Sequence, residues 1–333
     1  MGVDLKDLVP RSNVSIDDLE GKKLGVDAFN WLYQFLSIIR QRDGTPLKDS
    51  KGRVTSHLTG LFYRTAKLLE AGVKLCYVFD GKPPEFKKVT ASRVKRRKKA
   101  RKAYEKAKAA GDYEKAYSKA MQSSRLTSQM VIDAKKLLEA FGLPVIQAPS
   151  EGEAQAAFMT LKGDLYAAAT QDYDAVLFGA PRVIRNLNIT GRRRRGNAYV
   201  SVSPELVLFD EVLKETSLSH EELVTLAVLI GTDYNPGGVK GIGPKRGLKL
   251  VKEHGVDAWK EVNWDWDINP PDIIGFFMNP PVLSDYELSW RAPDKDKIIK
   301  LLVDDYEFSR DRISSTLKKV MKAAGQAGLG EFL

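Results

Sequence analysis

Cysteine and histidine are scarce in this chain, and their scarcity limits the chemistry that the protein can perform. Cys76 is the single cysteine, which excludes an internal disulfide and a zinc site built from several thiolates. Imidazole groups come from His57, His220 and His254 alone. Any bound metal ion is therefore expected to have oxygen ligands.

Long apolar runs are also missing. The sequence has no stretch of about 18 uncharged apolar residues, which predicts that nothing spans a membrane. Residues 1–10 carry Asp4, Lys6 and Asp7 where a secretory signal peptide would need an apolar core. We therefore expect an intracellular protein without membrane contact.

The composition is that of a folded, basic protein. At 333 residues, with 43% hydrophobic and 29% charged residues, the chain is long enough for one large or two ordinary globular domains. Lysine and arginine exceed the acids by 53 to 43, which gives a net charge of +10. This excess favours a polyanionic partner, although many basic proteins need their charge for solubility alone.

Acidic residues follow several apolar runs that are rich in β-branched side chains. The runs are Lys23–Val26 before Asp27, Val73–Phe79 before Asp80, Pro144–Ile146 before Glu151, and Leu165–Ala169 before Asp172. Helical patterns come after them, and this alternation predicts an α/β fold with a mostly parallel central sheet flanked by helices. Ligands of such sheets bind outside the carboxyl ends of the strands, so the acids should meet at one edge.

Basic residues gather in two places. A long helical insertion is predicted over residues 84–139, and its segment Lys87–Lys108 holds twelve Lys or Arg residues and one acid, Glu105. The run GRRRRG at residues 191–196 is flanked by glycines and predicts a loop or a hairpin tip. A helical pattern returns from about Ser219, and the last residues, MKAAGQAGLGEFL, have too few apolar positions to pack and predict a tail.

The acids at the strand ends predict a metal site. The candidate ligands are Asp27, Asp80, Glu151, Glu153, Asp172, Asp174 and Asp233. So many carboxylates in one crevice cannot all stay ionised without compensation, because like charges raise one another's pKa. Mg²⁺ prefers carboxylate, water and phosphate oxygens, and more acids than one ion needs suggests two ions acting on a phosphodiester.

Each acid taken singly has a simpler explanation. An Asp after a strand is more often a helix N-cap or a turn former than a metal ligand. Glu151 and Glu153 follow Ser150 and match the first turn of a helix, where acids complement the helix dipole. Capping preferences alone do not predict acids at four strand ends of one sheet, so the metal site is favoured for the set.

Six segments together resemble the flap endonuclease family of the structure-specific 5′-nuclease superfamily, in an archaeal member. They are GVDAFNWLYQFL, YVFDGKPPEFK, APSEGEAQAA, TQDYDAVLFG, LIGTDYNPGGVKGIGPKRG and QAGLGEFL, and the similarity runs from Met1 to the last residue. The resemblance implies a PIN-like 5′-nuclease core with a helical arch, and it places all seven acids at the family's ligands for two Mg²⁺ ions, with Mn²⁺ as a substitute. It also implies cleavage of branched DNA at the base of a 5′ flap, in replication and repair, with 5′-3′ exonuclease activity.

The same resemblance assigns roles to residues outside the acid cluster. Lys87 and Arg93 match the arch residues that draw the scissile phosphate onto the metals. Tyr33 matches the tyrosine that stacks on a base beside the cut, although spacing alone favours a core aromatic residue. Arg40 and Arg64 are similar to positions that contact the duplex, although unaided each would be taken for a surface arginine.

The segment GVKGIGPKRG resembles the family's helix-two-turn-helix element. Glycines allow close approach to a phosphate, and the N–H groups that begin the following helix point toward it. The predicted DNA contacts are Gly241, Gly243, Lys245 and Arg246. By resemblance, a monovalent cation such as K⁺ binds here through the carbonyls of Gly238, Val239 and Ile242.

The C-terminal residues resemble a motif that binds the sliding clamp PCNA. Gln326, Leu329, Phe332 and Leu333 follow the spacing Q-x-x-L-x-x-F-F, with Leu333 in place of the last aromatic residue. The alternative is a disordered end with two chance apolar residues.

These patterns divide the chain into a nuclease domain at residues 1–325 and a clamp-binding tail at 326–333. The arch occupies 84–139 and the helix-two-turn-helix region 219–255. We expect a monomer in the cytoplasm or nucleoid. Three alternatives stay open: a sibling nuclease such as a junction resolvase, repair incision nuclease or 5′ exonuclease; a non-catalytic protein that binds junctions or the clamp; and a ribonuclease with a similar acidic sheet.

Overall fold

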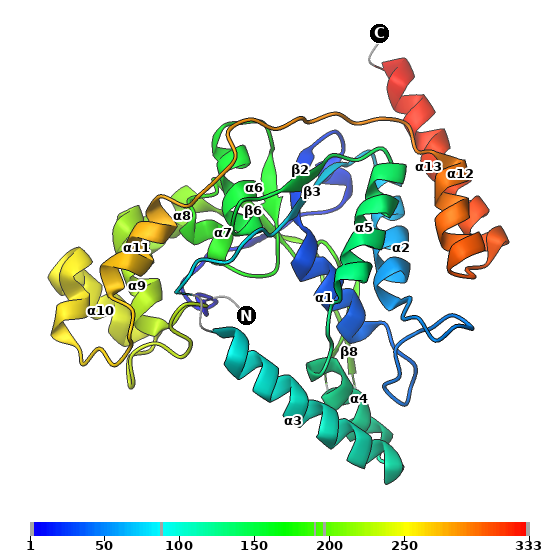
Figure 1. Cartoon of the computed structure of the whole chain (residues 1–333). Helices are drawn as coiled ribbons and strands as arrows, with labels where there is room; N and C mark the ends of the chain where they lie inside the picture. The colour runs from blue at the N-terminus through cyan, green and yellow to red at the C-terminus, as the bar shows by residue number, and fades with distance from the viewer. Residues whose placement is uncertain (1–2, 87–88, 190, 196–197, 331–333) are drawn as a thin grey trace.

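A mostly parallel sheet forms the centre of the molecule (Figure 1). The computed structural model of the chain describes residues 3–86, 89–189, 191–195 and 198–330. The strands of this sheet lie in the order β1-β9-β6-β5-β2-β3-β4. They are β1 (Ser12–Asn13), β2 (Lys23–Asp27), β3 (Lys74–Phe79), β4 (Val145–Gln147), β5 (Ala167–Ala169), β6 (Arg182–Arg185) and β9 (Glu205–Leu208).

The parallel part of the sheet confirms the prediction from the four apolar runs. Strands β4, β3, β2, β5 and β6 pair in parallel, with Asp27 opposite Val78 and Val26 opposite Ala169. The sequence pattern did not predict β1, β6 and β9. Of these, β9 pairs antiparallel with both β6 and β1, and β1 forms the edge.

Helices cover both faces of the sheet, and the side chains of β3 show how the chain separates the two layers. Leu75, Tyr77 and Phe79 belong to one hydrophobic cluster, and Cys76 and Val78 belong to the other. Successive side chains of a strand point to opposite faces, so a run of apolar residues supplies both cores. Burial also raises the pKa of the Cys76 thiol to about 12, which makes this cysteine a packing residue.

Different segments of the chain supply the helices on the two faces of the sheet. One face packs against α1 (Ala28–Ile38), α2 (Ser56–Glu70), α5 (Ser128–Ala140), α12 (Lys295–Ile299) and α13 (Arg310–Gly330). The other cluster includes residues of α6 (Gly152–Leu161), α7 (Asp174–Leu177), α8 (Phe209–Thr216), α9 (His220–Ile230), α10 (Pro244–His254) and α11 (Pro270–Met278). Shorter turns are η1 (Asp17–Leu19), η2 (Gly255–Glu261) and the π-helical η3 (Lys300–Asp305).

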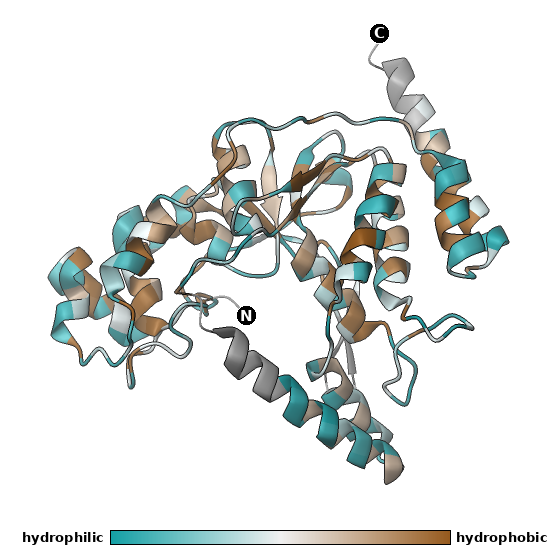
Figure 2. Cartoon of the chain, viewed as in Figure 1, coloured by the Kyte–Doolittle hydropathy of each residue, from teal (hydrophilic) through white to brown (hydrophobic). Residues whose placement is uncertain are grey.

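The predicted insertion contains two kinds of helix. Helices α3 (Val89–Ala109) and α4 (Tyr113–Gln122) pack on each other and stand away from the sheet (Figure 1). Figure 2 shows α3 as mainly hydrophilic where its side chains are described. Helix α5 instead buries Ala134, Leu137 and Leu138 in the core, so the segment that projects from the sheet and its covering helices ends before residue 128.

The arginine run and the C-terminal tail both have more regular secondary structure than their sequences predict. The arginine run forms β7 (Arg192–Arg195), which pairs antiparallel with β8 (Ala198–Ser201) as a two-stranded hairpin. The predicted C-terminal tail is helical as far as Gly330, because α13 continues through it.

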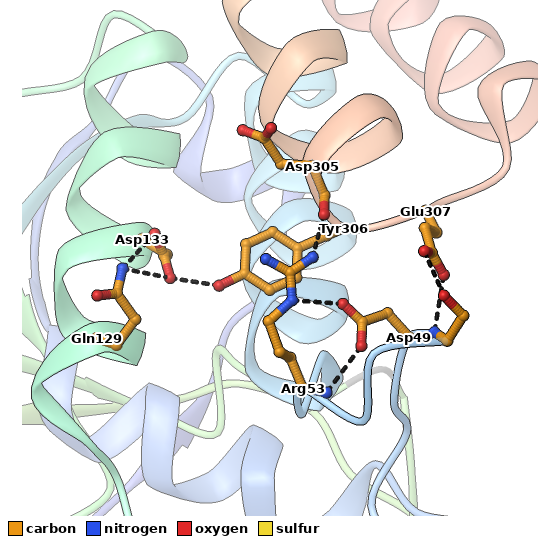
Figure 3. A network of polar contacts seen from close by, with 8 residues as sticks. Asp49, Arg53, Gln129, Asp133, Asp305, Tyr306 and Glu307 are labelled. Carbon is orange, nitrogen blue, oxygen red and sulfur yellow. Dashed lines mark hydrogen bonds and ion pairs between the residues drawn. The ribbon is translucent and has the colours of Figure 1, made fainter.

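A polar network joins the loop between α1 and α2 to the C-terminal helices (Figure 3). The Arg53 guanidinium lies 4.2 Å from the ring centroid of Tyr306 and donates to the carbonyl of Asp305. The Tyr306 hydroxyl donates to Asp133 of α5 over 2.5 Å, and Ser50 donates to Glu307. The network fixes residues 49–53 against η3.

The segment 279–294 crosses from α11 to α12 over the sheet (Figure 1). The backbone of Leu283 exchanges two hydrogen bonds with the side chain of Gln155 in α6. Farther along, the Trp290 indole donates to the carbonyl of Leu75 over 2.8 Å. In the described part of the chain, no helix has the length and apolarity that crossing a bilayer would need.

Candidate active site

The predicted acids lie where strands of the sheet end and helices begin. Asp27 ends β2, Asp80 follows β3, and Asp172 and Asp174 follow β5. Glu151 and Glu153 open α6 after β4, and Asp233 follows α9. The parallel pairing of β5, β2, β3 and β4 puts these ends at one edge of the sheet.

Electrostatic repulsion shows that the acids lie near one another. Burial raises the pKa of Asp27 well above its usual value, and the charges of Asp80, Asp172 and Glu151 raise it further. Asp27 is 7% exposed, so little water screens these charges. A hydrogen bond from the backbone of Asn30 acts in the opposite direction.

The remaining acids join the same cluster. Burial raises the pKa of Glu153 well above its usual value, and Asp174, Asp27 and Asp172 add to the shift. Burial followed by the charges of Asp172 and Asp233 raises the pKa of Asp174 to about 7. All seven predicted ligands are therefore connected by mutual repulsion, which is the convergence that the strand-end pattern predicts.

Neutral donors fix the orientation of several carboxylates. The side chain of Asn30 donates to Asp172 over 3.2 Å, and the Thr170 hydroxyl donates to Glu153 over 2.7 Å. The backbone N–H of Gly152 donates to Asp80 over 2.7 Å. A Cβ at Gly152 would lie 2.8 Å from that carboxylate oxygen, so glycine lets α6 approach Asp80 closely.

Both explanations of the strand-end acids apply to Asp27. Its carboxylate accepts the Asn30 N–H over 3.0 Å and so caps α1, while the same group repels Asp80. Glu151 occupies the N-cap position of α6 without a capping hydrogen bond from its side chain. Helix capping therefore accounts for the position of Asp27 but not for that of Glu151, which the metal-site explanation still covers.

The donor set fits hard divalent cations. The cluster offers carboxylate oxygens of buried acids whose pKa values are raised, first by burial and then by the charges of neighbouring acids. Among the residues that the structure describes, no group of three or more His, Cys, Asp or Glu side chains forms a cage that could hold a metal ion. Mg²⁺ needs no such cage, because it retains waters and takes substrate phosphate oxygens alongside one or two carboxylates.

Tyr33 lies on α1 and is partly exposed, unlike its fully buried neighbours Trp31 and Leu32. The guanidinium of Arg97 in α3 lies 5.1 Å from the centroid of its ring. This exposure disagrees with a core aromatic residue. The ring instead lies where α1 meets the projecting helix α3, and the Arg97 guanidinium already stacks on it.

Two predicted duplex contacts have partners inside the protein. Arg40 donates to the carbonyl of Gly44 and the hydroxyl of Ser124, each over 2.7 Å. Arg64 is 3% exposed rather than on the surface, and its Nε donates to the carbonyl of Leu187 over 2.5 Å. Its two terminal nitrogens have no hydrogen-bond partner among the described residues, and a DNA contact would require the side chain to move.

The loop between α9 and α10 presents the predicted phosphate contacts to solvent. Gly241, Gly243, Lys245 and Arg246 are all exposed, and the last three surround the start of α10. The carbonyls assigned to a monovalent cation already accept hydrogen bonds in two cases. Gly238 accepts the Trp266 indole N–H over 3.3 Å, and Val239 accepts the Ile242 N–H over 3.0 Å.

Some predicted residues lie outside the part that the structure describes. Lys87, Phe332 and Leu333 are among them, and Arg93 belongs to α3 without a described side chain. Gln326 and Leu329 belong to helix α13, and their side chains are likewise not described.

The neutral residues that orient the acids were not predicted from the sequence. Asn30 lies three positions after Asp27, and Thr170 begins the segment that contains Asp172 and Asp174. Polar residues beside strand-end acids are the available signal, but their partners lie in distant segments. The Asn30 contact with Asp172, for example, joins residues 142 positions apart.

Comparisons with known proteins agree with this architecture. The XPG N-terminal domain matches residues 1–103, and the XPG I-region matches residues 142–233. Flap endonuclease 1 of Pyrococcus horikoshii is 53% identical over 335 aligned residues, which cover 99% of this chain and 97% of the relative.

Solved structures extend the agreement to three dimensions. Flap endonuclease-1 from Methanococcus jannaschii is 42% identical, with a TM-score of 0.79, covering 98% of this chain and 100% of the other. The catalytic core of Rad2 in complex with a DNA substrate is 25% identical, with a TM-score of 0.72, covering 96% and 100%. The chain therefore belongs to the flap endonuclease 1 family of structure-specific 5′ nucleases.

Proposed function

We propose that this protein hydrolyses branched DNA at the base of a 5′ flap, using two Mg²⁺ ions held by the seven-carboxylate cluster. The observation that carries the proposal is the convergence of Asp27, Glu153 and Asp174 with the other acids at the carboxyl edge of the sheet, close enough for their charges to raise one another's pKa. When bound, such ions lower the pKa of attacking water and offset the charge that develops on the phosphate. The products would be a 5′-phosphate and a 3′-hydroxyl.

Residues of this chain would orient the metals and the DNA. Asn30 and Thr170 hold the carboxylates of Asp172 and Glu153 in place before the substrate arrives, which avoids reorganisation during the reaction. Lys87 and Arg93 would draw the scissile phosphate to the cluster. Tyr33 would stack on a base beside the cut, which requires Arg97 to leave the face of its ring.

The DNA duplex would contact surfaces beside the acids. Exposed glycines and cations at the start of α10 suit a phosphate, since N–H groups and basic side chains converge there. The hydrophilic α3 would attract the single-stranded flap by its charge. By resemblance we also assign a monovalent cation to the α9–α10 loop and a sliding clamp to residues 326–333, with a monomeric enzyme acting on chromosomal DNA.

The proposal is tested with end-labelled DNA that carries a 5′ flap beside a one-nucleotide 3′ flap. Asp172→Asn should slow Mg²⁺-dependent release of the flap by roughly 10²- to 10³-fold, because one carboxylate of the site is lost. The control is Asp257→Asn, an exposed acid in η2 that pairs with Lys260. Binding is measured by fluorescence anisotropy in EDTA and should stay close to wild type in both variants.

Matched substrates separate the alternatives. Preference for a four-way junction over the 5′ flap would replace the proposed substrate with that of a junction resolvase. Tight binding without cleavage by the wild-type protein would favour a junction-binding module. Equal cleavage by Asp172→Asn and wild type would contradict the metal role of the acid cluster.

A further inference from the structure

Arg185 clamps the loop that carries two of the acids. It lies at the end of β6, and its Nε and Nη2 donate to the carbonyl of Gln171 over 3.1 and 3.0 Å. Its Nη1 donates to the Tyr173 hydroxyl over 2.6 Å, and the guanidinium lies 4.1 Å from the centroid of that ring. One side chain therefore contacts the loop on both sides of Asp172.

Arg185 is itself held in position. It pairs across the antiparallel β6–β9 ladder with Glu205, and its Nη1 lies 3.4 Å from that carboxylate. The Arg185 side chain is 16% exposed, so water competes weakly for its donors. A planar guanidinium offers several donors in a fixed geometry, which suits simultaneous contacts with a carbonyl and a hydroxyl.

A second chain of contacts anchors the same loop from α1. The side chain of Gln171 donates to Asn188 over 2.7 Å, and Asn188 donates to Gln34 over 2.5 Å. Asn188 is buried, so this connection is protected from solvent. Gln171, the residue before Asp172, is thus held at two points. Arg185 binds its backbone carbonyl, and Asn188 connects its side chain to α1.

The loop needs restraint because its acids repel each other. Asp172 and Asp174 stand on either side of one residue in this short loop, and like charges at such short range repel each other. In a free loop, this repulsion would be relieved by moving the carboxylates apart, and a metal ion would then have to bring them back together. A rigid loop avoids that reorganisation, as hydrogen-bonded partners of ligands do in metal sites.

We propose that Arg185 is a positioning residue that fixes the spacing of Asp172 and Asp174 and thereby sets the affinity of the site for divalent metal ions. The inference rests on the proposed metal role of these two acids. Arg185 acts through the Gln171 carbonyl and the Tyr173 hydroxyl, without touching the DNA or the reacting atoms.

The test compares Arg185→Met with a matched variant on the same strand. Arg182 begins β6, donates to the carbonyl of Tyr166 over 2.9 Å, and stacks 4.8 Å from the centroid of that ring. It thus makes the same kinds of contact at the opposite end of the strand. Arg182→Met removes an equal charge without affecting the acidic loop.

Two readouts are measured for each variant: Mn²⁺ binding to the DNA-free protein by electron paramagnetic resonance, and the Mg²⁺ concentration that gives half-maximal cleavage of 5′-flap DNA in single turnover. Arg185→Met should weaken both by about 10- to 100-fold, the range for partners of metal ligands. Cleavage at saturating metal should recover toward the wild-type rate. Arg182→Met should stay within about twofold of wild type in both.

Conservative variants keep the test informative if Arg185→Met unfolds. Arg185→Lys keeps the charge but cannot reach both acceptors at once, so its metal affinity should lie between Arg185→Met and wild type. Tyr173→Phe removes the hydroxyl that accepts from Arg185 over 2.6 Å and from Arg11 over 3.4 Å, and it should weaken metal binding by about fivefold, which corresponds to the shorter hydrogen bond. Thermal unfolding in EDTA confirms that each variant is folded.

The outcomes distinguish this inference from the proposed function. Metal affinity within twofold of wild type in folded Arg185→Met would overturn the positioning role, and so would an equal loss in Arg182→Met. Weaker DNA binding in EDTA with unchanged metal affinity would overturn it too, because Arg185 would then act on the DNA. If instead Asp172→Asn kept full activity and full Mn²⁺ binding, the proposed metal role itself would fail.

Discussion

Asp174 belongs to the acid cluster, and its buried charge destabilises the folded state. It is 8% exposed and lies beside Asp172 and Asp233, and its pKa is raised to about 7. The backbone N–H of Val3 donates to it over 3.1 Å, which offsets part of the penalty. At neutral pH and above, the folded state therefore holds an unfavourable charge that the unfolded chain exposes to water.

The sign of the pH dependence follows from this shift. The unfolded chain loses the proton near pH 3.8, and the folded chain keeps it until about pH 7. The folded state thus binds more protons between these values, so the contribution of Asp174 to the free energy of unfolding falls as pH rises from about 4 to about 7. Above pH 7 the penalty is constant.

We therefore expect Asp174→Asn to stabilise the metal-free protein. Asparagine keeps an acceptor for the Val3 N–H without the charge, so in EDTA at pH 8 unfolding should become harder by roughly 1 to 4 kcal/mol. The gain should be smaller at pH 5 and should shrink when Mg²⁺ is added to the wild type. Thermal denaturation at both pH values measures it, and an equal gain at pH 5 and pH 8 would contradict the electrostatic cause.

The α9–α10 loop depends on glycine for two separable reasons. Gly238 has φ of +60°, and a Cβ there would overlap the carbonyl oxygen of Leu229 and the backbone of Ile230. Gly243 has φ of −102°, and a Cβ there would have no neighbour within 4 Å. The first glycine is required by the fold, and we attribute the second to close approach of a DNA phosphate.

Alanine substitutions separate these two requirements. Gly238→Ala should lower the free energy of unfolding by roughly 2 kcal/mol, because both the backbone angle and the contact become unfavourable. Gly243→Ala should leave stability within about 0.5 kcal/mol and weaken flap-DNA binding several-fold. Denaturant unfolding and anisotropy titrations measure the two effects. Wild-type binding by Gly243→Ala would exclude a close phosphate contact at this glycine.

At the scale of the whole molecule, a net charge of +10 coexists with a cluster of acids at one edge of the sheet. The acids occupy the carboxyl edge of the sheet, whereas α3 and the start of α10 supply cations on separate elements. Figure 1 shows α10 at the far left of the molecule and α3 at the bottom, below the sheet. A negatively charged polymer can therefore contact several basic surfaces while one phosphate reaches the acids.

Salt dependence tests this distribution of charge. The logarithm of the DNA association constant should fall linearly with the logarithm of KCl concentration, and replacing Lys245 and Arg246 with Ala should reduce the slope by about two, one for each lost phosphate contact. Lys260→Ala, an exposed cation paired with Asp257, should leave the slope unchanged. Equal slopes for the double variant and wild type would place the DNA elsewhere.

The sequence by itself determined four of the five parallel strands, the edge of the sheet at which their ends meet and the set of acids. Apolar runs followed by acids are local patterns, and parallel pairing places the ends of such runs together. The scarcity of cysteine and histidine likewise limits metal ligands to oxygen, whatever the fold. These properties depend on residue type and spacing, which a sequence displays directly.

The tertiary structure alone decided which side chains meet. It buries Arg64, which sequence alone would place on the surface, packs α5 into the core, and brings Asn30 to Asp172 across 142 positions. The strands β6 and β9 are short and carry charged residues, so their sequences show no clear alternation of apolar and polar residues. The pairing of Arg185 with Glu205 could therefore not be predicted from the sequence. Such contacts depend on how helices and strands pack, and local propensities do not specify the distance between segments that are far apart in the chain.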